Sequence, residues 1–365
     1  MPDWTKSMQQ SYEYYTVEPT TLADLKRLEN VKSASFSRDS ESETLGSATI
    51  DVTNSVGESY IRCYLKTIQN GVTEKVPLGM VLSQTPSSSF NGKILDVSMD
   101  CYTPLIELKE KKPPLGYTVR KGTRIMDAAY RIVRENARVP VNKVEPLYEK
   151  NSDGELVDVS PTLQRDFVAN TYDTWLKFII DLIANAKYEL GLGERGDILF
   201  LPKQDMASLQ PVWTFDDDNS SILYPELTMD HDLYGIPNVV EVIYSYGSDY
   251  KQAIAKNEDP NSPISTINRG REIVHRDTEP SLAGYVTQEQ IQNYAERLLK
   301  ELSTIEYTVS YTHAYCPVRV GDCVRLNYTR AGIKNIKAKV ISQNIKCEPG
   351  CPVSEKAVFT SKLWG

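Results

Sequence analysis

Short runs of alternating apolar and polar residues fill residues 31–103. In the segment YIRCYLK (60–66), Ile61, Cys63 and Leu65 alternate with Arg, Tyr and Lys side chains. A period of two is typical of a strand that buries one face, and serine-rich turns separate the runs. We therefore expect a small antiparallel barrel or sandwich. The predicted strands are 48–53, 60–66, 76–82 and 92–103.

A helical period replaces this alternation in three later segments. In residues 123–137 the apolar side chains recur at steps of three and four, which places them on one face of a helix. Segments 171–190 and 287–303 repeat this spacing. The first apolar stripe consists of Ile125, Ala128, Ala129, Ile132 and Val133. The expected N-caps are Thr123, then Thr171 or Asp173, then Thr287 in a capping box with Gln290.

Strand-like runs return in the C-terminal part of the chain, divided by the third helix. The run 238–246 comes first, and the polar segment 250–273 after it reads as irregular. Three further strands are predicted at 305–315, 323–328 and 336–345. We therefore expect a second β region, with one strand before the helical excursion and at least three after it.

Composition and charge narrow the function classes. A chain of 365 residues with 40% apolar and 25% charged residues predicts a globular protein of two or three domains. A net charge of −8 argues against a general nucleic-acid binder. Residues 109–143 nevertheless carry ten Lys or Arg against three acids, with Arg124, Arg131 and Arg138 recurring every seven residues. This basic stretch is either a solvated face or a docking surface for an acidic partner.

The N-terminal segment lacks an apolar run, so we expect no signal peptide. The most apolar helical run, 175–186, is interrupted by Lys177 and Asp181 and is too short to span a bilayer. The six cysteines are then expected to be reduced thiols in a cytosolic setting.

Three polar motifs suggest sites but have the wrong context. Residues 191–196, GLGERG, match a dinucleotide fingerprint, and Asp216 mimics its ribose-binding acid. However, the predicted helix precedes the glycines and a strand follows, so a β-hairpin turn is expected. The acids Asp216–Asp218 lack the spacing of a calcium loop. In MDHD (229–232), Asp230 and Asp232 flank His231, and neighbouring side chains of a strand point to opposite faces.

The segment HAYCPVRVGDCVRLNY (313–328) gathers His313, Cys316, Asp322 and Cys323. A closed zinc site would need four ligands, most naturally Cys316, Cys323, Cys347 and Cys351. The spacing of the second pair fits a metal knuckle, whereas the six residues inside the first pair do not. Metal binding, pairing and ordinary strand or turn cysteines remain open. A His313–Cys316 nucleophile pair lacks a third, orienting residue.

The chain contains no Walker loop, H-E-x-x-H or G-x-S-x-G motif. A pair of catalytic carboxylates for glycoside hydrolysis has no required spacing, and no feature of the sequence favours one. The sequence therefore predicts no catalytic residue, no cofactor and no metal ligand set.

Taken in order, the elements resemble the baseplate (tail) hub proteins of tailed bacteriophages and related contractile injection systems. The resemblance begins with LENVKSASFSRDSESETLGSATIDV (28–52), a strand pair after a short lead helix. It continues with the helix in VRKGTRIMDAAYRIVRENA (119–137) and with the helix and hairpin of residues 174–202. The remaining matches are IPNVVEVIYSY (236–246), QIQNYAERLLKELS (290–303) and PVRVGDCVRLNY (317–328). The cysteines and the last segment, CEPGCPVSEKAVFTSKLWG (347–365), lie outside the pattern.

This resemblance implies a mainly β fold with α+β insertions: two small tail-tube-like antiparallel β-barrels and a mixed α/β domain. The second barrel would take its strands from 236–246 and 304–345. The implied boundaries are an N-terminal arm at 1–30, a first barrel at 31–115, an α/β insertion domain at 116–235, a second barrel at 236–345 with a helical insertion at 247–303, and a C-terminal extension at 346–365.

The resemblance also implies a structural virion protein and not an enzyme. Hub proteins form a trimeric, pseudo-hexameric ring that joins the tail tube protein to the central spike protein and surrounds a channel for DNA and the tape-measure protein. An acidic chain is consistent with a lumen through which DNA passes without specific binding. The protein would assemble in the bacterial host cytoplasm and contact no membrane. Two alternatives are a tail-associated cell-wall hydrolase and a receptor- or glycan-binding tail component, the latter favoured by 22 tyrosines.

Overall fold

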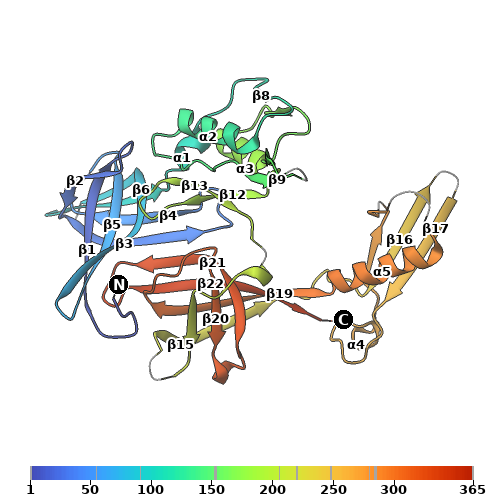
Figure 1. Ribbon diagram of the computed structural model, residues 1–365. Helices are drawn as coiled ribbons and strands as arrows, with labels where there is room; N and C mark the ends of the chain where they lie inside the picture. The colour runs from blue at the N-terminus through green and yellow to red at the C-terminus, as the bar shows by residue number, and fades with distance from the viewer. Residues whose placement is uncertain are drawn as a thin grey trace. The chain divides into compact units, whose positions relative to one another are not determined.

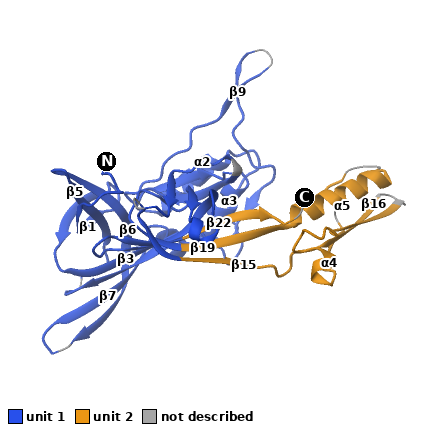
Figure 2. Ribbon diagram, turned by 90° about the horizontal axis from the view of Figure 1, so that it is seen from below, with its two compact units in different colours: residues 1–226, 311–355 blue, residues 227–310, 356–365 orange. Residues whose placement is uncertain are grey.

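The computed structural model (Figure 1) describes residues 2–54, 56–90, 92–151, 154–204, 206–218, 221–246, 249–278, 280–282 and 286–363. It divides into two compact units (Figure 2). Unit 1 comprises Met1–Glu226 and Tyr311–Glu355, and unit 2 comprises Leu227–Ser310 and Lys356–Gly365.

The first β region of unit 1 contains the strands that the alternating pattern predicted. They pair antiparallel in the order β3-β4-β7-β6-β5-β1-β2. Ala48, Ile50 and Val52 of β4 are buried, which confirms the predicted apolar face. The strands are β1 (Gln9–Glu18), β2 (Ala23–Leu28), β3 (Val31–Asp39), β4 (Gly46–Val52), β5 (Tyr60–Gln69), β6 (Val72–Phe90) and β7 (Leu95–Tyr102).

Residues 1–30, expected to form an arm, contribute two strands to this sheet. β1 pairs with β5 along its length, from Gln9↔Ile68 to Val17↔Tyr60. β2 occupies the place where a short lead helix was expected, and it pairs with β1. All its side chains except that of Leu28 are exposed. β2 is therefore held as a strand by backbone hydrogen bonds to β1. Such bonds do not appear in the hydrophobic pattern of a sequence.

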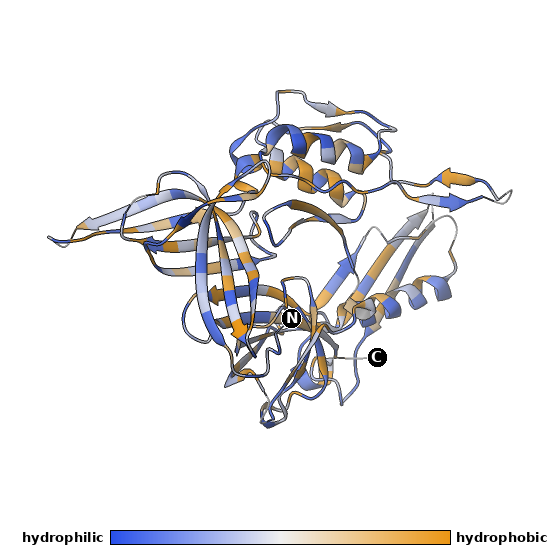
Figure 3. Cartoon of the chain, turned by 60° about the vertical axis from the view of Figure 1, so that its left-hand side comes forward, coloured by the Kyte–Doolittle hydropathy of each residue, from blue (hydrophilic) through white to orange (hydrophobic). Residues whose placement is uncertain are grey.

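The insertion after the first β region is a mixed α/β layer. Its helices α2 and α3 bury the predicted apolar stripes, and each has one hydrophobic and one hydrophilic face (Figure 3). They pack with β12 and β13 and with Tyr60 and Met80 of the first β region in one apolar cluster. The elements are α1 (Ile106–Glu110), β8 (Thr118–Val119), α2 (Ile125–Asn136), β9 (Tyr148–Lys150), β10 (Leu156–Asp158), β11 (Phe167–Val168), α3 (Trp175–Ala184), β12 (Tyr188–Leu192) and β13 (Ile198–Pro202).

The predicted caps of these two helices are wrong. α3 is capped by Thr174, whose Oγ1 accepts a hydrogen bond of 3.2 Å from the Lys177 amide, and not by Thr171 or Asp173. α2 begins after Arg124 without a side-chain cap. Thr123 cannot cap it, because bridge pairing of Arg124 with Thr162 keeps the chain extended one residue further.

The second β region of unit 1 joins the first one. β21 pairs with β3 from Ser342↔Asp39 to Lys346↔Ser35, so the strands of both regions belong to one sheet of 13 strands. No pairing among the described residues closes either region into a ring. The elements are η1 (Met206–Ser208), β14 (Trp213–Asp216), β15 (Leu223–His231), β19 (Thr304–Ala314), β20 (Cys323–Asn327), η2 (Thr329–Ala331), β21 (Ile336–Lys346) and β22 (Pro352–Lys362).

The C-terminal segment 346–365, expected to be an extension, supplies strand β22. In the sheet, β22 lies between β19 and β21. The buried side of β22 consists of Val353, Glu355 and Ala357. The glutamate among them interrupts the apolar pattern that would have predicted a strand. The chain passes between the two units within β15, β19 and β22.

Unit 2 contains a three-stranded sheet covered by one helix. β16, expected in the second barrel, pairs instead with β17 and β18. β17 lies in the segment that was expected to be irregular. The prediction missed this strand because its buried face consists of small alanines, Ala253 and Ala255. Thr287 and Gln290 form the predicted capping box of α5. The elements are β16 (Val239–Tyr246), β17 (Asp249–Lys256), α4 (Thr266–Arg269), β18 (Val274–Asp277) and α5 (Gln288–Leu302).

The fold class predicted from the sequence, mainly β with α+β insertions, is therefore confirmed.

Candidate functional site

The cluster of His313 and Cys316 contains the geometry of a catalytic triad. The His313 Nδ1 atom lies 3.8 Å from the Cys316 Sγ atom, and its Nε2 atom lies 3.2 Å from the Glu355 Oε2 atom. A thiol, an imidazole and a carboxylate thus follow one another as in a triad. However, the Nδ1 atom also lies 2.8 Å from the Ala314 carbonyl oxygen, which can only accept a hydrogen bond, so Nδ1 is not free to take a proton from the thiol. The prediction that no third residue accompanies the pair is wrong. Glu355 is 42 residues from His313 in sequence, and only the position of β22 brings it there.

Burial removes this cluster from the candidate active sites. His313, Cys316 and Glu355 are each at most 1% exposed, so no substrate reaches the thiol. Burial also raises the pKa of Cys316, which keeps the thiol protonated. The Glu355 carboxylate accepts hydrogen bonds from the Tyr311 hydroxyl and, at 2.7 Å, from the Gln343 amide. The cluster is a buried polar network that joins β19, β21 and β22.

The cysteines named as a possible zinc ligand set do not converge on one metal position. The Cys323 Sγ atom contacts the carbonyl oxygen of Val324, and the Cys347 Sγ atom lies 3.8 Å from the Sγ atom of Cys63. All six thiols are free. Among the residues that the structure describes, no three His, Cys, Asp or Glu side chains are grouped so that they could hold a metal.

The glycine motif at 191–196 is a hairpin turn, as predicted. β12 and β13 pair antiparallel on either side of it, and the Gly193 amide donates to the Asp197 carbonyl oxygen at 2.8 Å. Asp216 lies on β14 and accepts from Asn327 at 2.9 Å, while Asp217 accepts from Thr329 at 2.8 Å. These acids stabilise neighbouring loops and strands.

The MDHD segment gives no joint site either. His231 packs its ring against Tyr307, with the centroids 5.1 Å apart. Asp232 accepts a hydrogen bond of 2.7 Å from the Tyr234 amide.

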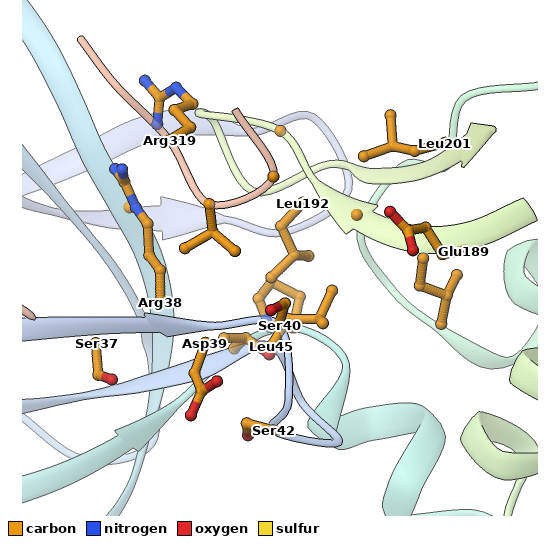
Figure 4. A pocket seen from close by; sticks show the side chains of 18 of the residues that line it. Ser37, Arg38, Asp39, Ser40, Ser42, Leu45, Glu189, Leu192, Leu201 and Arg319 are labelled. Carbon is orange, nitrogen blue, oxygen red and sulfur yellow. The ribbon is translucent and has the colours of Figure 1, made fainter. Parts of the chain in front are cut away.

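A cavity of about 470 Å³ opens in unit 1 between the β3–β4 turn, β6, the β12–β13 hairpin and the loop 319–321 (Figure 4). Arg38 and Arg319 lie near each other on one wall of this cavity. Its apolar lining includes Leu45, Leu78, Met80, Leu190, Leu192 and Leu201.

The cavity lining carries charge of both signs. Its basic residues are Arg38, Lys203, Arg319 and Lys339, and its acidic residues are Asp39, Glu41, Glu43, Glu189 and Glu194. Arg319 forms an ion pair with Glu194. Arg38 donates to two neutral oxygens, the Leu78 carbonyl at 2.6 Å and the Gln343 Oε1 atom at 3.1 Å. Burial, followed by the nearby charge of Arg319, lowers the pKa of Arg38 to about 10. The cavity therefore combines an apolar lining with charged side chains of both signs.

The sequence analysis missed this cavity, because its walls come from four segments that are distant along the chain. A basic residue within a strand, such as Arg38 in β3, would have been the only local signal.

The basic stretch 109–143 is partly neutralised within the chain. Arg124 forms ion pairs with Asp127 and Asp158. Arg138 donates to Glu107, with its Nε atom 2.6 Å from the Oε1 atom. Arg131 is exposed and forms no ion pair with the described residues. Of the three arginines that recur every seven residues, therefore, Arg131 offers its charge to a partner most freely.

Comparisons with known proteins agree with the resemblance found in the sequence. Residues 210–337 match the model of the family described as putative phage tail protein. No curated protein matches the sequence. In fold, the chain is similar to the tail protein from Neisseria meningitidis MC58, with a TM-score of 0.56 and 11% identity over 96% of each chain.

Two further structures share the fold. The 43 kDa tail protein of prophage MuSo2 from Shewanella oneidensis has a TM-score of 0.56 and 10% identity, over 95% of this chain and 98% of that one. A chain of the Francisella PdpA–VgrG complex has a TM-score of 0.53 and 8% identity, over 99% of this chain and 54% of that one. The predicted resemblance to phage tail and baseplate proteins is confirmed, by sequence over 210–337 and by fold over nearly the whole chain.

None of the described helices has the length and apolar character needed to cross a membrane.

Proposed function

We propose that this protein is a baseplate (tail) hub, a structural virion component that joins the tail tube to the central spike. The observation that carries the proposal is the shared fold: 95–96% of the chain superimposes on two tail proteins, and residues 210–337 match a tail-protein family. The similarity to a chain of the Francisella PdpA–VgrG complex supports a role in a larger assembly.

In this role three copies form a pseudo-hexameric ring, to which each copy contributes two related β regions. The pairing of β21 with β3 favours this arrangement, because it joins the two β regions of unit 1 into one continuous wall. The ring encloses the channel for DNA and the tape-measure protein. The net charge of −8 favours passage of DNA without adhesion to the wall. Assembly takes place in the bacterial cytoplasm, before incorporation into the virion.

The protein carries out no bond-making chemistry in this proposal. The triad-like arrangement of Cys316, His313 and Glu355 favours this view, since all three side chains are buried. A tail-associated cell-wall hydrolase is the first alternative. A receptor- or glycan-binding tail component is the second, and the exposed rings of Tyr172, Tyr234 and Tyr250 favour it.

Native mass spectrometry of the purified chain, alone and mixed with the tail tube protein of the same phage, tests the hub. We expect a trimer that binds a hexameric tube ring. A chain that stays monomeric and does not bind the tube protein would refute the proposed hub function. A zymogram on peptidoglycan distinguishes the first alternative, and a clearing band retained by the pure chain would favour it. A glycan array tests the second alternative in the same way.

A further inference from the structure

A two-stranded ribbon, described at residues 147–151 and 154–159, projects from the insertion of unit 1. It contains β9 and β10 and extends away from α2 and α3 (Figures 2 and 3). The pairs Tyr148↔Asp158 and Lys150↔Leu156 define its register. No third strand pairs with it among the described residues. Isolated two-stranded ribbons are at best marginally stable in water, so this one requires either fixation or a partner.

Contacts at its base fix the ribbon in place. Arg124 forms an ion pair with Asp158. The Leu147 amide donates to the Ser160 Oγ atom at 2.9 Å, and the Val159 amide donates to the Leu147 carbonyl oxygen at 2.9 Å. The ribbon is therefore presented in a set direction, which lowers the ordering cost of binding.

The ribbon exposes apolar side chains on both faces. Leu147 lies opposite Val159, and Val157 lies opposite Glu149, so the three apolar residues share one face. Contiguous exposed apolar residues of this kind mark an interaction surface. The exposed fractions are 49% for Leu147, 55% for Tyr148, 68% for Leu156, 44% for Val157 and 42% for Val159.

A complementary surface, here named the receiving surface, lies around the β8–β11 pair of the same insertion. Its apolar members Leu115, Val168 and Tyr172 are 86%, 53% and 89% exposed. β11 forms the edge of a two-stranded sheet. Three exposed cations, which form no ion pair with any described residue, complete it: Lys112, Lys121 and Arg165.

We propose that the ribbon of one copy docks on the receiving surface of a second copy of this chain. Charge complementarity selects this occupant, since the ribbon carries two exposed carboxylates, Glu149 and Glu155, that form no ion pair with any described residue, against one lysine, Lys150, and it meets the three cations of the receiving surface. The ribbon and the receiving surface are different patches, so the contact is head-to-tail. Such a contact forms a ring where the rotation between neighbouring copies closes, as the proposed ring requires. This inference rests on the proposed ring and names the surfaces that hold neighbouring copies together.

Mass photometry and native mass spectrometry of three variants test it. The ribbon variant carries Leu147→Ser, Val157→Ser and Val159→Ser, and the receiver variant carries Leu115→Ser and Tyr172→Ser. We expect each to dissociate into monomers, with the dissociation constant raised roughly a hundredfold or more. The control carries Leu25→Ser and Ile267→Ser, at positions 65% and 60% exposed, and retains the parent oligomer.

Mixing supplies the decisive result. The ribbon variant and the receiver variant together retain one intact contact, so their mixture forms one-to-one dimers and no ring. In a second set, Glu149→Lys with Glu155→Lys weakens the oligomer, and adding Lys121→Glu with Arg165→Glu in the same chain restores it.

An oligomer unchanged in the ribbon or receiver variant overturns the docking inference and leaves the proposed hub intact. A parent chain that is monomeric at 100 µM, a concentration of about a hundred times a micromolar dissociation constant, overturns the docking inference and the ring together. Thermal melting of each variant tests whether loss of the oligomer arises from unfolding. We expect unchanged melting temperatures, since all the changed side chains are exposed.

Discussion

Replacing Glu355 with alanine should strongly destabilise unit 1. The carboxylate is 1% exposed, accepts hydrogen bonds from Tyr311 and, at 2.7 Å, from Gln343, and lies 3.2 Å from the His313 Nε2 atom. Its removal leaves these donors facing a small cavity. Gln343 keeps one acceptor, the Val318 carbonyl oxygen at 3.0 Å. Losing one member of a buried, charged network costs about 3–5 kcal/mol.

Glu355→Gln keeps the volume and one acceptor oxygen, so we expect a smaller loss of about 1–2 kcal/mol. Urea unfolding followed by tryptophan fluorescence measures both, because Trp4, Trp175 and Trp213 all lie in unit 1. The matched control is Glu226→Ala, an exposed glutamate on β15 within unit 1, for which we expect a change of at most ~0.5 kcal/mol. A loss below ~1 kcal/mol for Glu355→Ala would refute the assignment of this network as a stabilising element.

Four further substitutions, in three experiments, test other parts of unit 1. Gly196→Ala should cost about 1–3 kcal/mol in urea unfolding, since Gly196 has φ +102° and an added Cβ would overlap Met80; a neutral effect would contradict the tight turn. The Lys75 ammonium group holds the pKa of Glu13 at about 2, below the ordinary 4.5. Glu13→Gln should therefore lower the free energy of unfolding above pH 4.5, by less than ~2 kcal/mol because the lysine is exposed. The difference in unfolding free energy between the two proteins should vanish as the pH falls toward 2, where Glu13 itself becomes protonated. A difference that stays constant over that pH range would contradict this account. Arg138→Glu should destabilise the chain by about 2–4 kcal/mol through repulsion from buried Glu107, whereas Arg131→Glu should leave thermal melting unchanged and weaken only assembly. Equal melting losses for the two arginine variants would show that their ion pairing does not differ as described.

Local periodicity predicted the elements whose buried face consists of large apolar side chains. The stripe of α2, from Ile125 to Val133, is buried as expected, and so are Ile61, Cys63 and Leu65 of β5. Arg62, which alternates with them and was expected on the polar face, is buried as well and forms an ion pair with Asp24. The prediction failed where other forces select the structure. β17 buries alanines, β22 buries a glutamate, and β2 is held by backbone hydrogen bonds to β1. A hydrophobic pattern contains little information about any of these three cases.

Strand partners and sites were less accessible from sequence for a related reason. β16 has the alternation of a strand, but nothing in that alternation distinguishes a partner in the second β region from its actual partners, β17 and β18. Likewise, His313 and Cys316 were visible as neighbours, whereas Glu355 joins them only through the sheet. The cavity brings Arg38 and Arg319 together, and these two residues meet through tertiary structure alone.

The buried polar residues explain how the two β regions of unit 1 keep a single register. Arg38 on β3 donates to Gln343 on β21, and Gln343 donates to Glu355 on β22. A shift of β21 by one residue against β3 would turn Gln343 to the opposite face, since side chains alternate along a strand. Both Arg38 and Glu355 would then lose a partner in a setting of low dielectric, which is costly. The same shift would also turn the buried apolar side chains of β21, Ala338, Val340 and Ile345, to the opposite face. The network therefore adds to the register that the apolar face already specifies, and the proposed ring wall would depend on this joint between the two β regions.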